Sequence, residues 1–182
     1  MNTWALPKTA KIGEKEYNIN TDFRDILEII QHLNDPEKPE QIRWMIAIGL
    51  FYEGDVPSRD MEPAARYLAD FISYGMQHES KGPVLLNWEQ DAQMIVADVN
   101  KVAGKEIRNM EYLHWWTFLS YFYGIGEGQL STVVSIRRKL KSGKKLEKWE
   151  QEYYRENRSR VDMKTHETKD KKQMQEYFNK WL

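Results

Sequence analysis

The sequence predicts a mostly α-helical fold, a compact bundle of about six helices with a short N-terminal β-hairpin and a C-terminal helical extension. Apolar residues recur at helical spacing over most of residues 21–141, and segments containing proline or glycine separate the periodic runs. A strand-like alternation occurs only in residues 10–20. Hydrophobic residues make up 41% and charged residues 30% of the 182 residues, which is typical of a globular domain.

The spacing of apolar residues changes from a strand-like to a helical period at about residue 21, which separates the first two predicted elements. Residues 10–20 favour a hairpin that turns at Gly13. Residues 21–33 favour a helix capped by Thr21 or Asp22, because a side-chain oxygen at that position accepts hydrogen bonds from the free N–H groups of the first turn. The segment NDPEKPE then ends this helix, since proline cannot donate a helical hydrogen bond.

Three further helices are expected before the aromatic segment described below. Residues 40–53 are apolar nearly all round, which is typical of a helix buried on all sides. Ser58 and Asn87 are suitable caps for the next two helices. In the helix after Asn87, the apolar residues line one side, Asp98 lies on the polar side, and Gly104 suits the left-handed C-terminal position.

The segment YLHWWTFLSYFYGIGEG, residues 112–128, is the most distinctive part of the chain. Its aromatic residues are compatible with an aromatic binding site, a membrane anchor, a metal or catalytic site around His114, or a core helix. The apolar residues surround the helix and leave no polar face, and the run is too short to span a membrane. Each buried ring stabilises the fold by about 1.5–3 kcal/mol. We therefore interpret the segment as core.

Residues 129–141 favour a sixth helix with Leu140 turned inward, and the composition changes after Lys145. We therefore divide the chain into a hairpin segment (1–20), a helical core domain (21–143) and a charged helical extension (144–182). Four large apolar residues of the extension fall on one face of a C-terminal amphipathic helix: Met174, Phe178, Trp181 and Leu182. This stripe either packs on the body or binds a partner, and the sequence does not separate the two.

The charge is distributed unevenly along the chain. Residues 137–182 contain 15 basic and 8 acidic residues, whereas residues 1–136 contain 12 basic and 20 acidic residues. The basic run that begins with Arg137, Arg138 and Lys139 is a candidate for binding an acidic protein. Phosphate contacts with nucleic acid are the less favoured alternative, because few aromatic residues accompany the run and glutamates follow it.

No residue pattern in the chain indicates enzyme chemistry. The four histidines lie in different elements, and cysteine is absent, so thiolate metal sites and a cysteine nucleophile are excluded. The segment GIGEG follows a helix rather than a strand, which argues against phosphate binding. Asp91 is interpreted either as a solvated helix residue or as the partner of an arginine such as Arg137. We expect no enzymatic activity, no cofactor and no metal.

Residues from about 15 to 140 resemble the bacteriophage gp-fifteen family, and the His-Trp-Trp-x-Phe element is the most specific part of this resemblance. The residues that carry the resemblance lie in three helices: Trp88, Asp91, Ile95, Leu113, His114, Trp115, Trp116, Phe118, Ile136 and Arg137. Family genes lie in the tail modules of phages and prophages of Gram-positive bacteria, near those for tail assembly chaperones and the tape measure protein.

The resemblance implies a tail morphogenesis protein, with an assembly chaperone or accessory factor as the favoured role. Its partners would be the tape measure protein or a companion chaperone, and the terminal stripe would serve client binding or self-association. A minor tail or connector protein of the virion is the alternative, and a nucleic-acid-binding regulator is less favoured. With no signal peptide and no membrane span in the sequence, we expect the protein in the cytoplasm of the bacterial host during phage assembly.

Overall fold

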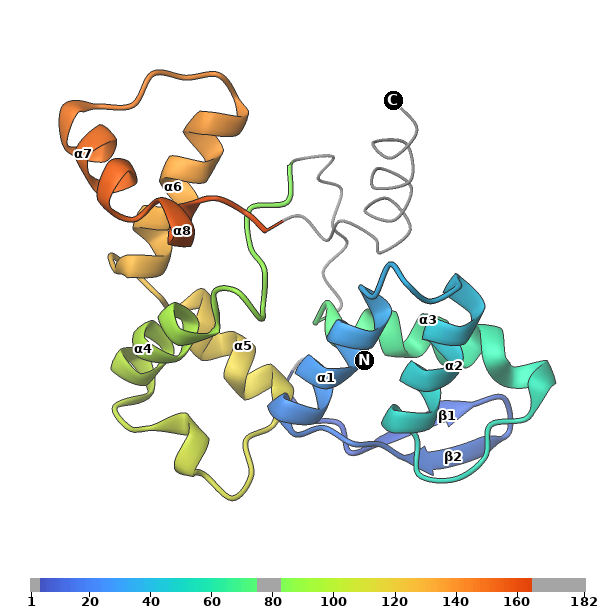
Figure 1. Cartoon of the computed structure of the whole chain (residues 1–182). Coiled ribbons are helices and arrows are strands. Elements are labelled where there is room, and N and C mark those ends of the chain that lie inside the picture. The colour runs from blue at the N-terminus through green and yellow to red at the C-terminus, as the bar shows by residue number, and fades with distance from the viewer. Residues whose placement is uncertain (1–3, 75–82, 165–182) are drawn as a thin grey trace, which may run out of the picture.

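A computed structural model describes residues 4–74 and 83–164 of the chain (Figure 1). Within these residues the chain forms a two-stranded antiparallel sheet, eight α-helices and two short 3-10 turns, which confirms the mostly helical fold. The elements are β1 (Thr9–Ile12), β2 (Lys15–Asn18), α1 (Phe23–Leu33), α2 (Glu40–Phe51), the 3-10 turn Ser58–Asp60, α3 (Met61–Ile72), α4 (Ala92–Ala103), the 3-10 turn Ile107–Asn109, α5 (Trp115–Tyr123), α6 (Gln129–Lys141), α7 (Lys148–Glu156) and α8 (Arg158–Val161).

The predicted hairpin is confirmed, with β1 and β2 paired so that Ala10 lies opposite Tyr17. Gly13 forms the turn with a φ of +60°, a conformation that favours glycine because it has no Cβ. The inner face of the hairpin is buried, and the Tyr17 ring packs edge-on against Tyr52 with 5.6 Å between the ring centroids. The hairpin thus closes one end of the core beside the C-terminus of α2.

Figure 1 shows the hairpin with α1, α2 and α3 on one side of the molecule and α4 to α8 on the other. Two main-chain hydrogen bonds join these halves, from Phe23 N–H to Leu113 C=O at 2.9 Å and from Trp115 N–H to Thr21 C=O at 2.7 Å. The ring of Phe23 also stacks on that of Phe118 at 4.9 Å. The start of α1 and the start of α5 therefore support each other.

Helix boundaries follow the predicted caps with two shifts. Asp22 caps α1 as expected, since its carboxylate accepts a hydrogen bond from the Arg24 N–H. Ser58 begins a 3-10 turn, and α3 starts only at Met61. Asn87 accepts hydrogen bonds from two N–H groups of the turn that precedes α4. Gly104 ends α4 in the left-handed conformation, with a φ of +69°.

Three predictions of burial are wrong. The helix predicted as buried on all sides, α2, packs against α1 and α3, and it leaves Ile42 43% and Met45 59% exposed. Leu140 is 39% exposed instead of turned inward, although it lies on the same face of α6 as Ile136 and Arg137, in the last turn of the helix. Asp98, assigned to a solvated face, is only 2% exposed because its carboxylate reaches the first turn of α6.

The predicted extension from residue 144 is in contact with the rest of the protein as far as the structure describes it. Glu150 of α7 and Val161 of α8 are both buried. The predicted C-terminal stripe, Met174, Phe178, Trp181 and Leu182, lies outside the described residues. Among the helices of residues 4–74 and 83–164, none has the length and apolar character needed to cross a membrane.

Candidate functional site

The two adjacent tryptophans at the start of α5 are buried and hydrogen-bonded. Trp115 is 1% and Trp116 2% exposed. Their indole N–H groups donate to the carbonyls of Ile72 and Phe71, each at 3.0 Å, and these carbonyls lie at the C-terminal end of α3. A helix end has carbonyls without helical partners, so the tryptophans supply donors where α3 needs them. The interpretation of the aromatic segment as core is confirmed for residues 113–119, whereas Tyr112 and Tyr123 at its two ends are 46% and 54% exposed.

His114 precedes these tryptophans and caps α5. Its Nδ1 accepts a hydrogen bond from the Trp116 N–H, and its Nε2 donates one to the Pro7 carbonyl, both at 3.0 Å. Nδ1 is thus unprotonated and the proton is on Nε2. Burial holds the pKa of His114 below its ordinary value, although the hydrogen bond to Pro7 opposes this effect. Because both ring nitrogens are bonded to the main chain, His114 serves the fold rather than a ligand.

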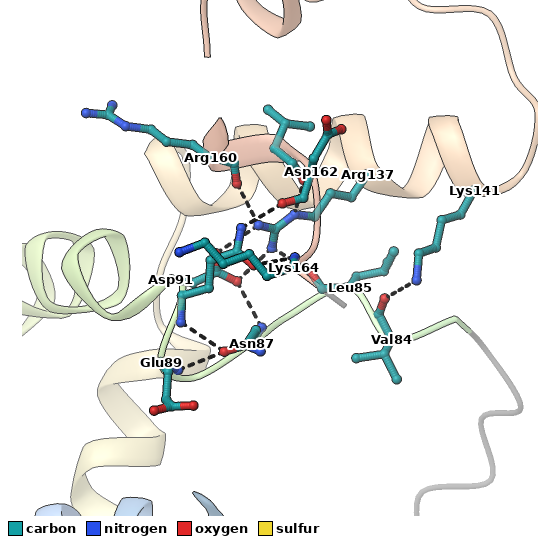
Figure 2. A network of polar contacts seen from close by, with 12 residues as sticks. Val84, Leu85, Asn87, Glu89, Asp91, Arg137, Lys141, Arg160, Asp162 and Lys164 are labelled. Carbon is teal, nitrogen blue, oxygen red and sulfur yellow. Dashed lines mark hydrogen bonds and ion pairs between the residues drawn. The ribbon is translucent and has the colours of Figure 1, made fainter. Parts of the chain in front are cut away.

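Asp91 and Arg137 form a buried ion pair in which the guanidinium holds both carboxylate oxygens (Figure 2). The two N–O distances are 2.7 and 2.9 Å, and the side chains are 0% and 2% exposed. Of the two interpretations of Asp91 that the sequence left open, the pairing with Arg137 is confirmed. Asp91 also accepts a hydrogen bond from the Asn87 N–H at 2.9 Å.

Arg137 donates three more hydrogen bonds to main-chain carbonyls, and these contacts join distant parts of the chain. They reach Val161 at 2.7 Å, Arg160 at 2.7 Å and Leu85 at 3.0 Å. All of its N–H groups point toward partners inside the protein, which offsets the cost of burying a charge. Figure 2 shows that the pair sits where α6, α8 and the segment before α4 meet. Its role is to hold α8 and residues 85–91 on α6.

The residues that carry the family resemblance thus lie in or against the core, with Trp88 partly buried. The Trp88 ring is 5.9 Å from that of Trp115 and 6.2 Å from that of Phe118, measured between centroids. Ile95 is buried in the same core. These side chains pack together and stabilise the junction of α4, α5 and α6.

The basic run does not form the continuous surface that the sequence predicted. Arg137 is buried, so the prediction that it binds a partner on the surface is wrong for this structure. The Lys139 ammonium donates to both oxygens of Glu150 at 2.7 and 2.8 Å, and this contact holds the pKa of the Glu150 carboxyl below its usual value. Arg138 alone of the three is exposed. Within the described residues no group of three histidine, aspartate or glutamate side chains is placed to hold a metal ion.

The structure exposes an apolar surface that the sequence did not indicate. Ile42 and Met45 are exposed on α2, Ile46 is half-buried, and Gly49 is exposed one turn further along. Their spacing of three, four and seven residues from Ile42 puts them on one face of the helix, which we call the α2 outer face. Large contiguous apolar patches are typical of protein-binding sites, so this face is a candidate contact. Periodicity alone missed it, because α2 is apolar on both sides.

These features describe a helical protein with a buried polar network and exposed apolar side chains on one face of α2. The chain belongs to the family described as Bacteriophage Gp15 protein, whose model matches residues 4–163. The match extends beyond the resemblance noted over residues 15–140 and includes α7 and α8. Within the added region, the carbonyls of Arg160 and Val161 in α8 accept hydrogen bonds from Arg137. No curated protein and no solved structure matches the chain.

Proposed function

We propose that this phage protein is a tail morphogenesis factor that acts as an assembly chaperone or accessory factor for the tape measure protein or another tail protein. Membership of the Bacteriophage Gp15 protein family supports a phage role. The observation that carries the chaperone role is the α2 outer face, an apolar helix surface that no other described element covers. We propose that it acts by reversible binding and not as an enzyme.

The chemistry of the client follows from this surface. A tape measure protein is a long helical chain with apolar stripes that need cover until the tail tube surrounds it. A client helix with apolar residues at i, i+3, i+4 and i+7 can pack this stripe against Ile42, Met45 and Ile46. Burial of one such side chain contributes about 1.5–3 kcal/mol, so a few of them support binding that is still reversible.

Co-purification of the full chain with a tape measure fragment tests this proposal. Replacing Ile42 and Met45 with aspartate is expected to weaken binding by at least about tenfold, because each change removes roughly 1.5 kcal/mol or more of apolar burial. Val102→Asp is the matched control, since Val102 is also a helical residue and is 42% exposed, against 43% for Ile42. Equal binding by all these variants would rule out the α2 outer face as the contact.

The terminal stripe is the second candidate contact in this proposal. Phe178→Ala and Trp181→Ala should lower client binding if the stripe takes part in it. Normal binding in these variants would remove the stripe from the proposal and leave the α2 outer face in place. Mass spectrometry of finished phage particles addresses the role itself, because an assembly chaperone is expected to be absent from them.

A further inference from the structure

We propose that copies of this chain associate head to tail, with the basic turn between α6 and α7 of one copy entering an acidic cleft at the hairpin end of the next. The proposal rests on two surfaces of the described residues and on their positions. It concerns the protein alone and does not depend on the client proposed above.

The first surface is the basic tip, which we define as Arg138, Lys141, Lys144, Lys145 and Lys148. Residues 138–149 contain six basic residues and one acidic residue. Lys144 and Lys145 lie in the turn between the helices, they are exposed, and no described residue forms an ion pair with either. The tip therefore carries positive charge that residues 4–74 and 83–164 leave without an ion pair at Lys144 and Lys145.

Trp149 lies beside the basic tip and is 54% exposed. Its indole N–H donates to the Glu147 carboxylate at 3.0 Å, which restricts the orientation of the ring. Tryptophan is enriched among the residues that dominate protein interfaces, because a large ring gains much buried area for little lost freedom. A charged tip with a pre-positioned aromatic residue is thus suited to insertion into a partner.

The second surface is the acidic cleft between the hairpin turn and the segment that leads into α3. Four carboxylates line it, from Glu14, Glu16, Asp55 and Asp60, against two basic residues. Its volume of about 990 Å³ is at the upper end of the range for protein pockets and gives room for several side chains. Tyr17 also lines the cleft, and among the described residues its buried hydroxyl has no hydrogen-bond partner.

The positions of the two surfaces favour a second copy as the occupant. In Figure 1 the turn between α6 and α7 and the turn between β1 and β2 lie at opposite ends of the molecule. Each copy therefore presents one tip and one cleft of opposite charge, facing away from each other. The contact is heterologous, so repeating it builds a ring or a filament instead of a closed pair. Nucleic acid is negatively charged, so it would complement the basic tip but not the acidic cleft.

Sedimentation velocity of the full chain at several concentrations and salt levels tests the proposal. We expect association at about 50 mM NaCl that weakens at about 500 mM, where the Debye length falls from roughly 14 to about 4 Å. Lys145→Glu and Asp55→Lys should each weaken association by at least about tenfold, because each places like charges together. Both residues are exposed and lie outside helices and strands, so the variants are expected to fold.

Combining the two substitutions in one chain gives the decisive measurement. The double variant Lys145→Glu/Asp55→Lys restores opposite charges at the contact and should recover association. Lys105→Glu is the matched control, because Lys105 is also an exposed residue outside the helices and away from both surfaces. A wild-type chain that is monomeric at low salt, a loss equal to that of the control, or no recovery in the double variant would overturn the proposal. Binding of duplex DNA by a monomeric chain, abolished by Lys145→Glu, would overturn it too.

Discussion

Replacing Arg137 with alanine would leave the Asp91 carboxylate buried without its guanidinium. Asp91 is 0% exposed, and Arg137 supplies two of its hydrogen bonds. Removing one partner of a buried ion pair costs about 3–5 kcal/mol, because the remaining charge has neither water nor a counter-charge. Three main-chain carbonyls lose their donor in the same variant. We expect the free energy of unfolding to fall by about this amount.

Urea unfolding followed by circular dichroism and tryptophan fluorescence measures this loss. Domains of this size are stable by about 5–15 kcal/mol, so the change is a large part of the total. At about 2–4 °C per kcal/mol, we expect the Tm to fall by roughly 10 °C. Arg138→Ala, one residue along and exposed, should change the stability by at most about 0.5 kcal/mol. An Arg137→Ala protein as stable as this control would refute the assigned role of the pair.

A double-mutant cycle separates the pair from its surroundings. Asp91→Leu combined with Arg137→Met removes both charges, so the loss should be smaller than the sum of the two single losses by about 0.5–3 kcal/mol. Hydrogen exchange should show the amides of α8 losing protection first, because Arg137 holds the carbonyls of Arg160 and Val161. Strictly additive losses, or uniform exchange across the protein, would contradict this account.

The pKa of His114 is lowered in the folded protein, so the unfolded state binds a proton more readily and acid favours unfolding. The contribution of His114 to the free energy of unfolding should be fully present above about pH 6.5 and should fall as the pH drops below it. Urea midpoints at several pH values should show this slope in the wild type and a weaker one in His114→Asn, and equal slopes would exclude His114 as its source. A Cβ at Gly128 would lie 2.5 Å from the Asp98 carboxylate, so Gly128→Ala should cost about 1–3 kcal/mol. Gly126→Ala is the control, since a Cβ there meets nothing within 4 Å. Thermal unfolding compares the two variants. An equal Tm would show that the Asp98 side chain moves aside at no cost.

The local elements were predictable because their causes lie close together in the sequence. The turn at Gly13 and the caps at Asp22 and Gly104 depend on the conformation and hydrogen bonding of a few adjacent residues. The aromatic segment was predicted as core because it has no polar face. In each case the signal and the structure it determines occupy the same turn of the chain.

The errors arose where a residue's environment depends on a distant element. Asp98 is buried because α6 begins beside it, 32 residues away from its bonded partner Leu130. Arg137 was assigned to a basic surface because its neighbours in sequence are basic, with pairing to Asp91 as an open alternative. Its five hydrogen bonds go to four residues in two other segments. Helical period does not tell which of two apolar faces of α2 meets the core, and so the α2 outer face was missed.

The sequence by itself determined a mostly helical protein with one hairpin, a largely buried aromatic helix and an uneven distribution of charge. The tertiary structure alone decided which charges are neutralised inside and which remain on the surface. Arg137 and Lys139 are bound to Asp91 and Glu150, whereas Lys144 and Lys145 remain free of ion pairs with the described residues. The reason is physical: secondary structure follows from neighbours along the chain, but burial and pairing follow from neighbours in space.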